Sequence, residues 1–418
     1  MEAYLIDGGR PLDGVMEIHG AKNSVLPIMA ACVCCAGTCE IRNCPRISDV
    51  ETAVAILRHL GCRVERRGGT LAVDAAGLAR CDIPAKLMRD MRSSILFLGA
   101  LLARCGRADL VLPGGCALGA RPVDLHLQAM GRLGARAEQA GDRITCRAGA
   151  LRGQEFTLRF PSVGATENAM LAALGCRGTV VLRNAAREPE IVDLAQFLRV
   201  LGAQVSGEGT DRLTVQGGAP LHGAAYTVMP DRIETATYLC AAAGCGGDVF
   251  LAGAERRSLE AVISVLGRSG CQITEEASGL RIQASGRLTP PGSVATAPHP
   301  GFPTDAQAPV MAAMLRAAGT TGFTETIFEN RMRHVPQLRR LGADITLYGR
   351  RAVVRGVGTL RGADMEATDL RCGAALIVAA LQAEGESRVT GVPYIRRGYE
   401  ALAENLRNAG AAVTLQNE

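Results

Sequence analysis

The chain of 418 residues contains no tryptophan, and aromatic residues make up only 3% of it, although 48% of the residues are hydrophobic. A buried core must therefore be built mainly from aliphatic side chains, and the length predicts two or three domains. Apolar runs are interrupted by glycine or charge well before the roughly 18 residues that a membrane span requires, so we expect no membrane partner.

The sequence also lacks a charged-then-apolar leader and any run of lysine and arginine. Its net charge of +5 is dispersed, which argues against a nucleic-acid partner and favours a local cluster of positive charge. Fifteen cysteines are present, an odd number that, without a leader, predicts a reducing cytoplasm.

Most of the cysteines lie in apolar helical patterns, where we interpret them as small buried side chains. These include Cys32, Cys34, Cys35, Cys105, Cys240 and Cys245. Cys32 and Cys35 have C-x-x-C spacing, but no second pair follows at zinc-site distance. We therefore expect neither a metal nor a cofactor.

One phrase recurs along the chain: a helix that ends in L-x-x-x-G or a similar pattern, followed by a short strand. Its marker glycines are Gly61, Gly134, Gly202, Gly270, Gly342 and Gly410. In the first copy, Ser48 and Glu51 have the spacing of a capping box, and Gly61 supplies a left-handed end to the helix. Residues 62–74 then predict a hairpin of two strands, as do residues 203–217.

A second helix, rich in alanine and apolar all round, precedes each of these phrases and should be buried. The six buried helices begin near Ala21, Met91, Ala165, Asp231, Thr304 and Thr368. Six repeated units of about 70 residues predict an α/β protein with three units in each of two domains, divided near Tyr226 to Pro230. A six-unit open solenoid is the alternative.

Each buried helix begins among polar or charged residues. Three of these are candidate N-caps: Ser162, Thr304 and Thr368. A helix N-terminus disfavours cations, so Lys22, Arg92 and Arg371 require another explanation. If equivalent helix starts converge on one cleft between the domains, these cations, with Arg121 and Arg397, would bind a ligand that carries phosphate or carboxylate groups.

Three further residues have two interpretations each. Asp305, a carboxylate among cations, is a candidate proton acceptor, or else an N-cap or a salt-bridge partner. His126 and His299 are phosphate donors or core residues, and neither has metal-ligand spacing.

The stretch PGGCALGARPVD at 113–124 is a glycine-rich loop with one thiol and one fixed cation. A guanidinium such as that of Arg121 favours the thiolate form of a nearby cysteine, here Cys116. The loop is therefore a candidate reactive segment, and a surface loop with an incidental cysteine is the alternative.

Ten motifs carry a family resemblance. In chain order they are GAKN, MRSS, PGGCALGARPVDLH, SVGATEN, NAAREPEIVDLA, PDRIETATY, TAPHPGFPTD, ENRMRHVPQL, ATDLR and RRGYE. Together they resemble the UDP-N-acetylglucosamine 1-carboxyvinyltransferase family from the first residues to about Gly398. The resemblance implies transfer of the enolpyruvyl group of phosphoenolpyruvate to the 3′-hydroxyl of UDP-N-acetylglucosamine, the first committed step of peptidoglycan synthesis.

The resemblance also implies two inside-out α/β barrels with the active site between them. The first barrel would comprise residues 22–229, and the second would comprise residues 1–21 and 230–418. Each barrel would contain three βαβαββ-like units, in agreement with the six repeats.

The resemblance implies a role for each matching residue. Lys22, Arg121 and Arg397 would hold phosphoenolpyruvate, with Arg92 nearby. Cys116 would act as the general acid and be the target of fosfomycin, Asp305 would be the base for the sugar hydroxyl, and Asp369 a second carboxylate in proton transfer. The nucleotide-sugar contacts would be Asn23, Arg121, Pro122, Val123, Asp124, Leu125, His126, Ser162, Val163, Gly164 and Ile327, with Arg331 and Arg371 as further arginines of the site.

Three positions depart from the family pattern. Ser48 and Phe160 stand where many relatives have lysine, although Arg159 is adjacent to Phe160, and Arg396 replaces a common aspartate. None of them removes an implied catalytic group. Two other functions share parts of this pattern: 5-enolpyruvylshikimate-3-phosphate synthase, which lacks the cysteine loop, and a non-catalytic nucleotide-sugar sensor, which would need neither a proton donor nor a base.

Overall fold

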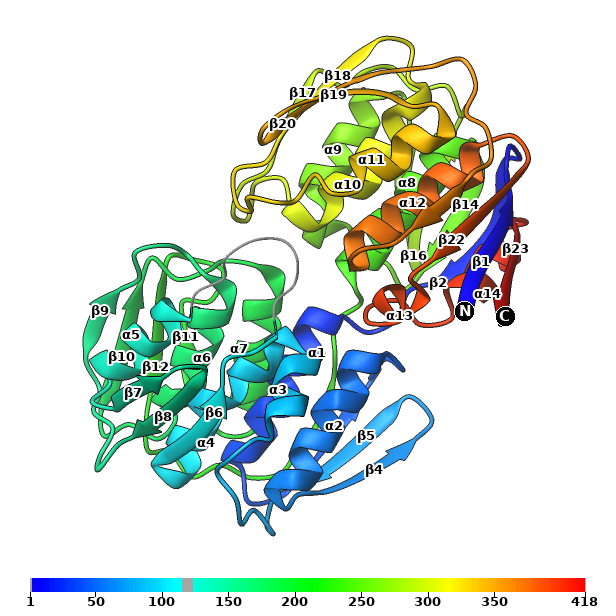
Figure 1. Cartoon of the computed structure of the whole chain (residues 1–418). Helices are drawn as coiled ribbons and strands as arrows, with labels where there is room; N and C mark the ends of the chain where they lie inside the picture. The colour runs from blue at the N-terminus through cyan, green and yellow to red at the C-terminus, as the bar shows by residue number, and fades with distance from the viewer. Residues whose placement is uncertain (1, 115–122, 418) are drawn as a thin grey trace. The chain divides into compact units, whose positions relative to one another are not determined.

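The computed structural model describes residues 2–114 and 123–417 (Figure 1). These residues form two compact units, which we call the N-terminal unit (20–114 and 123–229) and the C-terminal unit (2–19 and 230–417). Each unit has its own hydrophobic cluster. An open solenoid would have one continuous core, so that alternative is wrong and the α/β fold with two domains is confirmed.

The N-terminal unit contains three of the predicted repeats, with short 3-10 helices marked η. Its elements are α1 (Lys22–Ala31), η1 (Cys32–Cys34), β3 (Thr38–Arg42), α2 (Ser48–Leu60), β4 (Arg63–Arg67), β5 (Thr70–Asp74), α3 (Ala85–Asp90), η2 (Arg92–Leu96), α4 (Phe97–Cys105), β6 (Arg107–Val111), α5 (Asp124–Arg132), β7 (Arg136–Ala140), β8 (Arg143–Arg147), β9 (Glu155–Thr157), α6 (Val163–Ala173), β10 (Thr179–Arg183), α7 (Pro189–Val200), β11 (Gln204–Ser206), β12 (Arg212–Gln216) and β13 (Ala225–Thr227).

The C-terminal unit contains the other three repeats. Its elements are β1 (Glu2–Asp7), β2 (Leu12–Glu17), α8 (Arg232–Cys245), β14 (Gly247–Ala252), η3 (Arg256–Ser258), α9 (Glu260–Arg268), β15 (Gln272–Glu276), β16 (Gly279–Ala284), β17 (Ser293–Ala295), α10 (Thr304–Ala313), η4 (Met314–Arg316), β18 (Thr320–Thr324), α11 (Val335–Leu338), η5 (Arg339–Leu341), β19 (Asp344–Tyr348), β20 (Arg351–Arg355), β21 (Asp364–Glu366), α12 (Leu370–Gln382), β22 (Glu386–Thr390), α13 (Val392–Ile395), α14 (Leu402–Asn408) and β23 (Ala412–Asn417).

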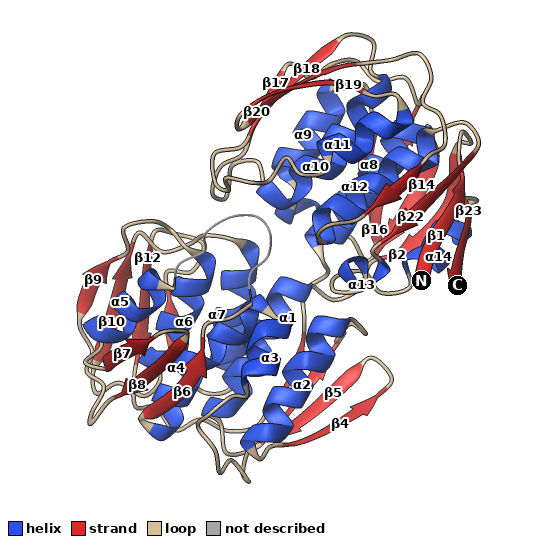
Figure 2. Cartoon of the chain, in the orientation of Figure 1, coloured by secondary structure: helices blue, strands red, loops and turns tan. Residues whose placement is uncertain are grey.

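Within each unit the strands form small sheets on the outside, and the helices lie inside them (Figure 2). The sheet orders are β13-β3-β5-β4, β6-β8-β7 and β11-β12-β10-β9 in the N-terminal unit, and β15-β16-β14-β2, β17-β18-β20-β19 and β21-β22-β1-β23 in the C-terminal unit. All six marker glycines have positive φ, between 83° and 103°. The repeats and the two hairpins described from the sequence are therefore confirmed.

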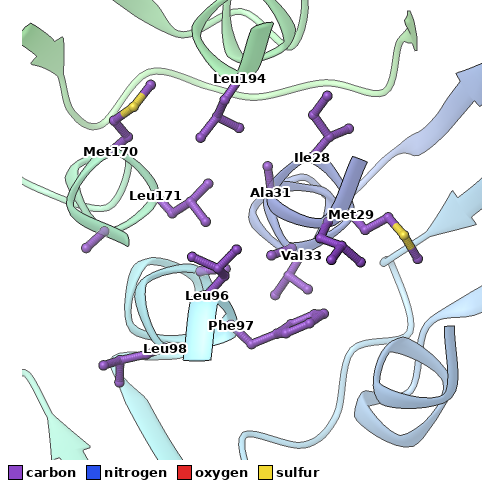
Figure 3. Packing of buried hydrophobic residues seen from close by; sticks show 14 of the residues in the cluster. Ile28, Met29, Ala31, Val33, Leu96, Phe97, Leu98, Met170, Leu171 and Leu194 are labelled. Carbon is purple, nitrogen blue, oxygen red and sulfur yellow. The ribbon is translucent and has the colours of Figure 1, made fainter. Parts of the chain in front are cut away.

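The interior of the N-terminal unit is the apolar contact between its three alanine-rich helical segments. Ala31 of α1, Leu96 of η2 and Leu171 of α6 lie between these segments, with Phe97 nearby, and all four side chains are buried (Figure 3). Burying a leucine side chain contributes about 1.5–3 kcal/mol. In the C-terminal unit α8, α10 and α12 pack on one another in the same way.

Several local expectations are wrong. The N-cap of α2 lies one residue before Ser48, so the capping box of Ser48 with Glu51 does not form. Thr304 is the first residue of α10 rather than its N-cap, and Asp369 rather than Thr368 caps α12. Cys105, expected to be buried, is exposed because it is the last residue of α4.

The sixth hairpin is completed by the N-terminus. Strand β1 pairs antiparallel with both β22 and β23, with Leu5 opposite Arg388 and Thr414. Periodicity along the chain does not indicate that β1, at the start of the chain, pairs with β23, at its end. Among the described residues, the helices are too short or too polar to span a membrane.

Candidate active site

Lys22 begins α1 in the N-terminal unit, and its charge is paired. Its Nζ lies 2.7 Å from Oδ2 of Asp49, in the first turn of α2, and the two side chains are 11% and 3% exposed. This ion pair explains why a cation is tolerated at the start of α1, a question that the sequence alone left open. Asn23 follows in the same turn and is partly exposed.

Asp193 of α7 holds the first turn of α1 in place. Its carboxylate accepts hydrogen bonds from Ser24 Oγ, from Tyr226 OH at 2.6 Å and from the backbone N–H of Met229 at 3.3 Å. Burial raises the pKa of Asp193, and these three donors oppose that shift. Ala21 also donates its N–H to the carbonyl of Met229 at 2.8 Å, so the segments at 21–24 and 226–229 form one hydrogen-bonded group.

A second group lies where α5 approaches the start of α6. Ser162 is the N-cap of α6, as predicted, and accepts the N–H of Ala165 at 3.4 Å. Val163 and Gly164 form the first turn, and the ring of His126 on α5 faces Gly164. His126 is 8% exposed, and its Nδ1 lies 2.7 Å from Nδ2 of Asn168.

The remaining expected residues of α5 surround this histidine. Val123 is buried before the helix, whereas Asp124 is exposed and forms an ion pair with Arg159, and Leu125 is half-buried. Burial and then the charge of Arg92 on η2 lower the pKa of His126 to about 4, against the opposite influence of Asp124. His126 is therefore neutral at physiological pH.

In the C-terminal unit, Asp305 lies in the first turn of α10 between two arginines. Arg331 Nη2 donates to Oδ1, and Arg371 Nη2 donates to Oδ2 at 2.9 Å. Arg331 also donates to the carbonyl of Thr304, at 3.2 Å from Nη2. The guanidinium side chains are 3% and 7% exposed and the carboxylate is 27% exposed, so Asp305 is the accessible member of this cluster.

The arginine on α12 is held from a second side. Arg371 Nη1 donates to Tyr399 OH at 3.4 Å, and that hydroxyl lies 2.8 Å from Thr237 Oγ1 on α8. Burial disfavours the charged guanidinium, but the negative charge of Asp305 and further groups more than offset it and raise the pKa of Arg371 above its ordinary value. The charge of Arg371 is therefore permanent.

Glu325, which the sequence did not single out, connects α10 to the segment that carries Ile327. Its carboxylate accepts hydrogen bonds from Thr304 Oγ1 at 2.9 Å, from Thr296 Oγ1 at 3.0 Å and from the N–H groups of Ile327 at 2.8 Å and Phe328 at 3.0 Å. Thr304 does not cap α10 because its hydroxyl makes this bond. Glu325 thereby fixes Ile327 relative to the helix that begins next to Asp305.

The other expected residues of this unit, Asp369 and Arg397, lie at a helix cap and after a short helix. Asp369 is 5% exposed and its Oδ1 caps α12 by accepting the N–H groups of Arg371 and Cys372, both at 3.0 Å. Arg397 is half-buried after α13. The charge of the adjacent Arg396 is offset by a two-point ion pair with Glu2, at 2.8 Å.

Three expected site residues, Cys116, Arg121 and Pro122, lie outside the described residues. His299 lines a pocket of about 130 Å³ in the C-terminal unit together with Arg232 and Arg257. Within the described ranges, no cluster of three or more histidine, cysteine or acidic side chains is arranged to bind a metal.

The fold is that of an enolpyruvyl transferase. The enolpyruvyl transferase NikO from Streptomyces tendae has a TM-score of 0.90 at 27% identity and covers 100% of this chain and 99% of its own. EPSP synthase from Acinetobacter baumannii has a TM-score of 0.76 with full coverage of both chains, and at 20% identity it shows the fold alone. The family model described as EPSP synthase (3-phosphoshikimate 1-carboxyvinyltransferase) matches residues 6–406.

Curated relatives specify the branch of this class. UDP-N-acetylglucosamine 1-carboxyvinyltransferase 2 of Caldanaerobacter subterraneus subsp. tengcongensis is 45% identical over 413 residues, and UDP-N-acetylglucosamine 1-carboxyvinyltransferase of Zymomonas mobilis subsp. mobilis is 47% identical over 422 residues, each with 99% of both chains covered. The chain belongs to the UDP-N-acetylglucosamine 1-carboxyvinyltransferase family.

Proposed function

We propose that this chain transfers the enolpyruvyl group of phosphoenolpyruvate to the 3′-hydroxyl of UDP-N-acetylglucosamine and releases phosphate. The observation that carries the proposal is an accessible carboxylate, Asp305, held by two buried guanidiniums at the start of α10. It occurs in a chain 45–47% identical, over 99% of its length, to relatives that are named UDP-N-acetylglucosamine 1-carboxyvinyltransferase.

The proposed chemistry is an addition followed by an elimination. Cys116 donates a proton to C3 of phosphoenolpyruvate, which leaves C2 electron-deficient. The 3′-oxygen bonds to C2 while Asp305 accepts its proton, and the resulting tetrahedral ketal then loses phosphate from C2 and a proton from C3, with Asp369 as a second carboxylate in the proton transfers. Fosfomycin is expected to alkylate the same cysteine.

The binding residues act by orientation and charge. Lys22, Arg121 and Arg397 neutralise the phosphate and carboxylate of phosphoenolpyruvate and fix its plane. Asn23, Ile327 and the start of α6 hold the nucleotide sugar, whose phosphates suit the free N–H groups of a helix N-terminus. The proposal requires the helix starts of both domains to face the same pair of ligands. The first domain comprises residues 22–229, and the second comprises residues 1–21 and 230–418.

We place the reaction in the cytoplasm, where it would begin peptidoglycan synthesis and so contribute to cell shape and division. Each of the fourteen cysteines that the structure describes is a free thiol, which suits a reducing compartment. A non-catalytic sensor of nucleotide sugars is disfavoured, because Lys22, Cys116, Asp305 and Arg397 are all retained and a sensor needs no proton donor or base.

The test is phosphate release from phosphoenolpyruvate with and without UDP-N-acetylglucosamine, with the nucleotide product analysed by mass spectrometry. We expect release to require the sugar and the product to gain one enolpyruvyl group. Asp305→Asn should abolish release without abolishing binding of the nucleotide sugar. Tight sugar binding by the unaltered protein, without any release, would instead support the sensor.

A further inference from the structure

The imidazole of His126 is fixed between two parts of α6. Its Nδ1 lies 2.7 Å from Nδ2 of Asn168, near the middle of that helix. The opposite edge of the ring faces the first turn, because a Cβ built on Gly164 would lie 3.0 Å from Cε1 and 3.4 Å from Nε2. A side chain at residue 164 would therefore press on the ring, and glycine lets it approach the helix start.

The hydrogen-bond partners of Asn168 determine which way its amide points. Its Oδ1 accepts the backbone N–H of Gly99 at 2.7 Å, and since a backbone N–H can only donate, this atom must be the carbonyl oxygen. Its Nδ2 donates to the carbonyl of Ile95 at 2.9 Å and also faces His126. All three partners are buried, so the orientation is not averaged by solvent.

This orientation selects one tautomer of the histidine. An amide NH₂ group is a donor only, so the Nδ1 atom of His126 must accept and carries no proton. In a neutral imidazole the proton then resides on Nε2. Burial, and then the charge of Arg92 on η2, lower the pKa of the ring to about 4. Among the described residues, the opposing charge is that of Asp124 on α5, which forms an ion pair with Arg159.

We propose that Asn168 is a positioning residue that fixes the tautomer of His126, so that the Nε2–H group donates a hydrogen bond to an oxygen of the nucleotide sugar at the first turn of α6. The inference rests on the proposed function, which places the nucleotide sugar at this helix start. A neutral donor adds to the N–H groups of Val163 and Gly164 without a charge that titrates, so it makes nucleotide-sugar binding independent of the protonation of this histidine near neutral pH.

The tautomer can be measured without an activity assay. The chain has six histidines, and the ¹⁵N signals of His126 are identified in NMR spectra by their loss in His126→Gln. We expect Nδ1 without a proton, Nε2 with one and no titration between about pH 5.5 and 8.5. A proton on Nδ1, or titration near the ordinary histidine pKa, would overturn the proposal.

Asn168→Asp supplies a matched change of the positioning residue. A carboxylate only accepts, so it keeps the hydrogen bond from Gly99 but favours a proton on Nδ1 of His126. The variant should show Nδ1 protonated and a titration moved toward neutral pH. An unaltered His126 spectrum in this variant would mean that Asn168 does not set the tautomer.

The donor role is tested by two substitutions of similar size. The amide nitrogen of glutamine can occupy the place of Nε2, whereas that of asparagine can occupy only the place of Nδ1. We expect the KM for UDP-N-acetylglucosamine to rise about 3-fold in His126→Gln and about 10-fold or more in His126→Asn, with a smaller change in the KM for phosphoenolpyruvate. His222→Gln, an exposed histidine of the same unit, is the control that should change neither.

Equal losses in the two variants would show that His126 only packs, which overturns its role as donor while the proposed function stands. Calorimetry of UDP-N-acetylglucosamine binding repeats the comparison without turnover. If the unaltered protein binds the sugar nucleotide and the two variants lose affinity in the predicted order, but no enolpyruvyl group is transferred, the proposed function fails and this inference stands. If it does not bind the sugar nucleotide, both fail.

Discussion

At the scale of single residues, the charges of the proposed site are held by partners. Of the 46 basic residues only Lys22 and Lys86 are lysines, and Lys22 forms a nearly buried ion pair with Asp49. An ammonium is a compact point charge with three donors, so it can contact Asp49 and a phosphate oxygen together. In the proposed function, Asp49 therefore positions Lys22 for phosphoenolpyruvate.

Replacement of this lysine should therefore affect both stability and catalysis. Lys22→Met removes the ammonium partner of Asp49, so we expect the free energy of unfolding to fall by about 3 kcal/mol. We also expect kcat/KM for phosphoenolpyruvate to fall by about 100-fold or more. Denaturant titration and initial rates measure the two effects, with Lys22→Arg as the variant that keeps the charge; an unchanged kcat/KM in Lys22→Met would contradict the assignment.

A second prediction at this scale concerns pH. Burial, and then the charges of Glu190 and Glu188, raise the pKa of Glu167 well above its ordinary value. The folded state therefore binds a proton that the unfolded state has released above about pH 4.5, so this residue lowers stability as pH rises toward its folded pKa. Glu167→Gln removes the titration.

We therefore expect the stability of Glu167→Gln relative to the unaltered protein to increase between about pH 5 and 8, by at most about 1.4 kcal/mol per pH unit. Denaturant titrations across this range measure the difference. Glu138→Gln, on the exposed strand β7, should show no such trend. Parallel pH profiles for Glu167→Gln and the unaltered protein would refute the burial argument.

At the scale of elements, Asp193 connects α7 to α1 and to the residues that follow β13. In Asp193→Asn, an amide replaces the carboxylate that accepts three hydrogen bonds. The NH₂ group of the amide can only donate, so at least one of these hydrogen bonds is lost. We expect a loss of about 2 kcal/mol in stability and faster hydrogen exchange at the first turn of α1. Tyr226→Phe removes one donor and should produce a smaller change in the same amides; if exchange accelerated equally over the whole unit, Asp193 would have no local role.

Helix positions followed from periodicity, but several caps did not. The sequence located each buried helix to within a few residues because apolar spacing and alanine content are local properties. Thr304 has a hydroxyl suited to capping, yet it donates to Glu325, a partner 21 residues away. Ser24 and Asp193 are separated by 169 residues. Such competing or distant partners are not encoded in any single stretch of sequence, which is why Asp49, Asp193 and Glu325 were missed.

At the scale of the whole molecule, six repeats with positive-φ glycines predicted the architecture. The number of separate hydrophobic cores depends on how the repeats pack together, and the structure shows two cores. The use of the N-terminal strand β1 to complete the last sheet could not be predicted, because the first residues resemble any short strand. The family motifs predicted which residues belong to the proposed site, whereas the ion pairs that these residues form could be found only in the structure.

The proposed function depends on UDP-N-acetylglucosamine being the acceptor of the enolpyruvyl group. It is tested most directly by measuring phosphate release from phosphoenolpyruvate with UDP-N-acetylglucosamine and, in parallel, with 3-phosphoshikimate, the acceptor named in the matching family model. We expect release with the sugar nucleotide and none above background with 3-phosphoshikimate. Release with 3-phosphoshikimate but not with UDP-N-acetylglucosamine would contradict the proposed function.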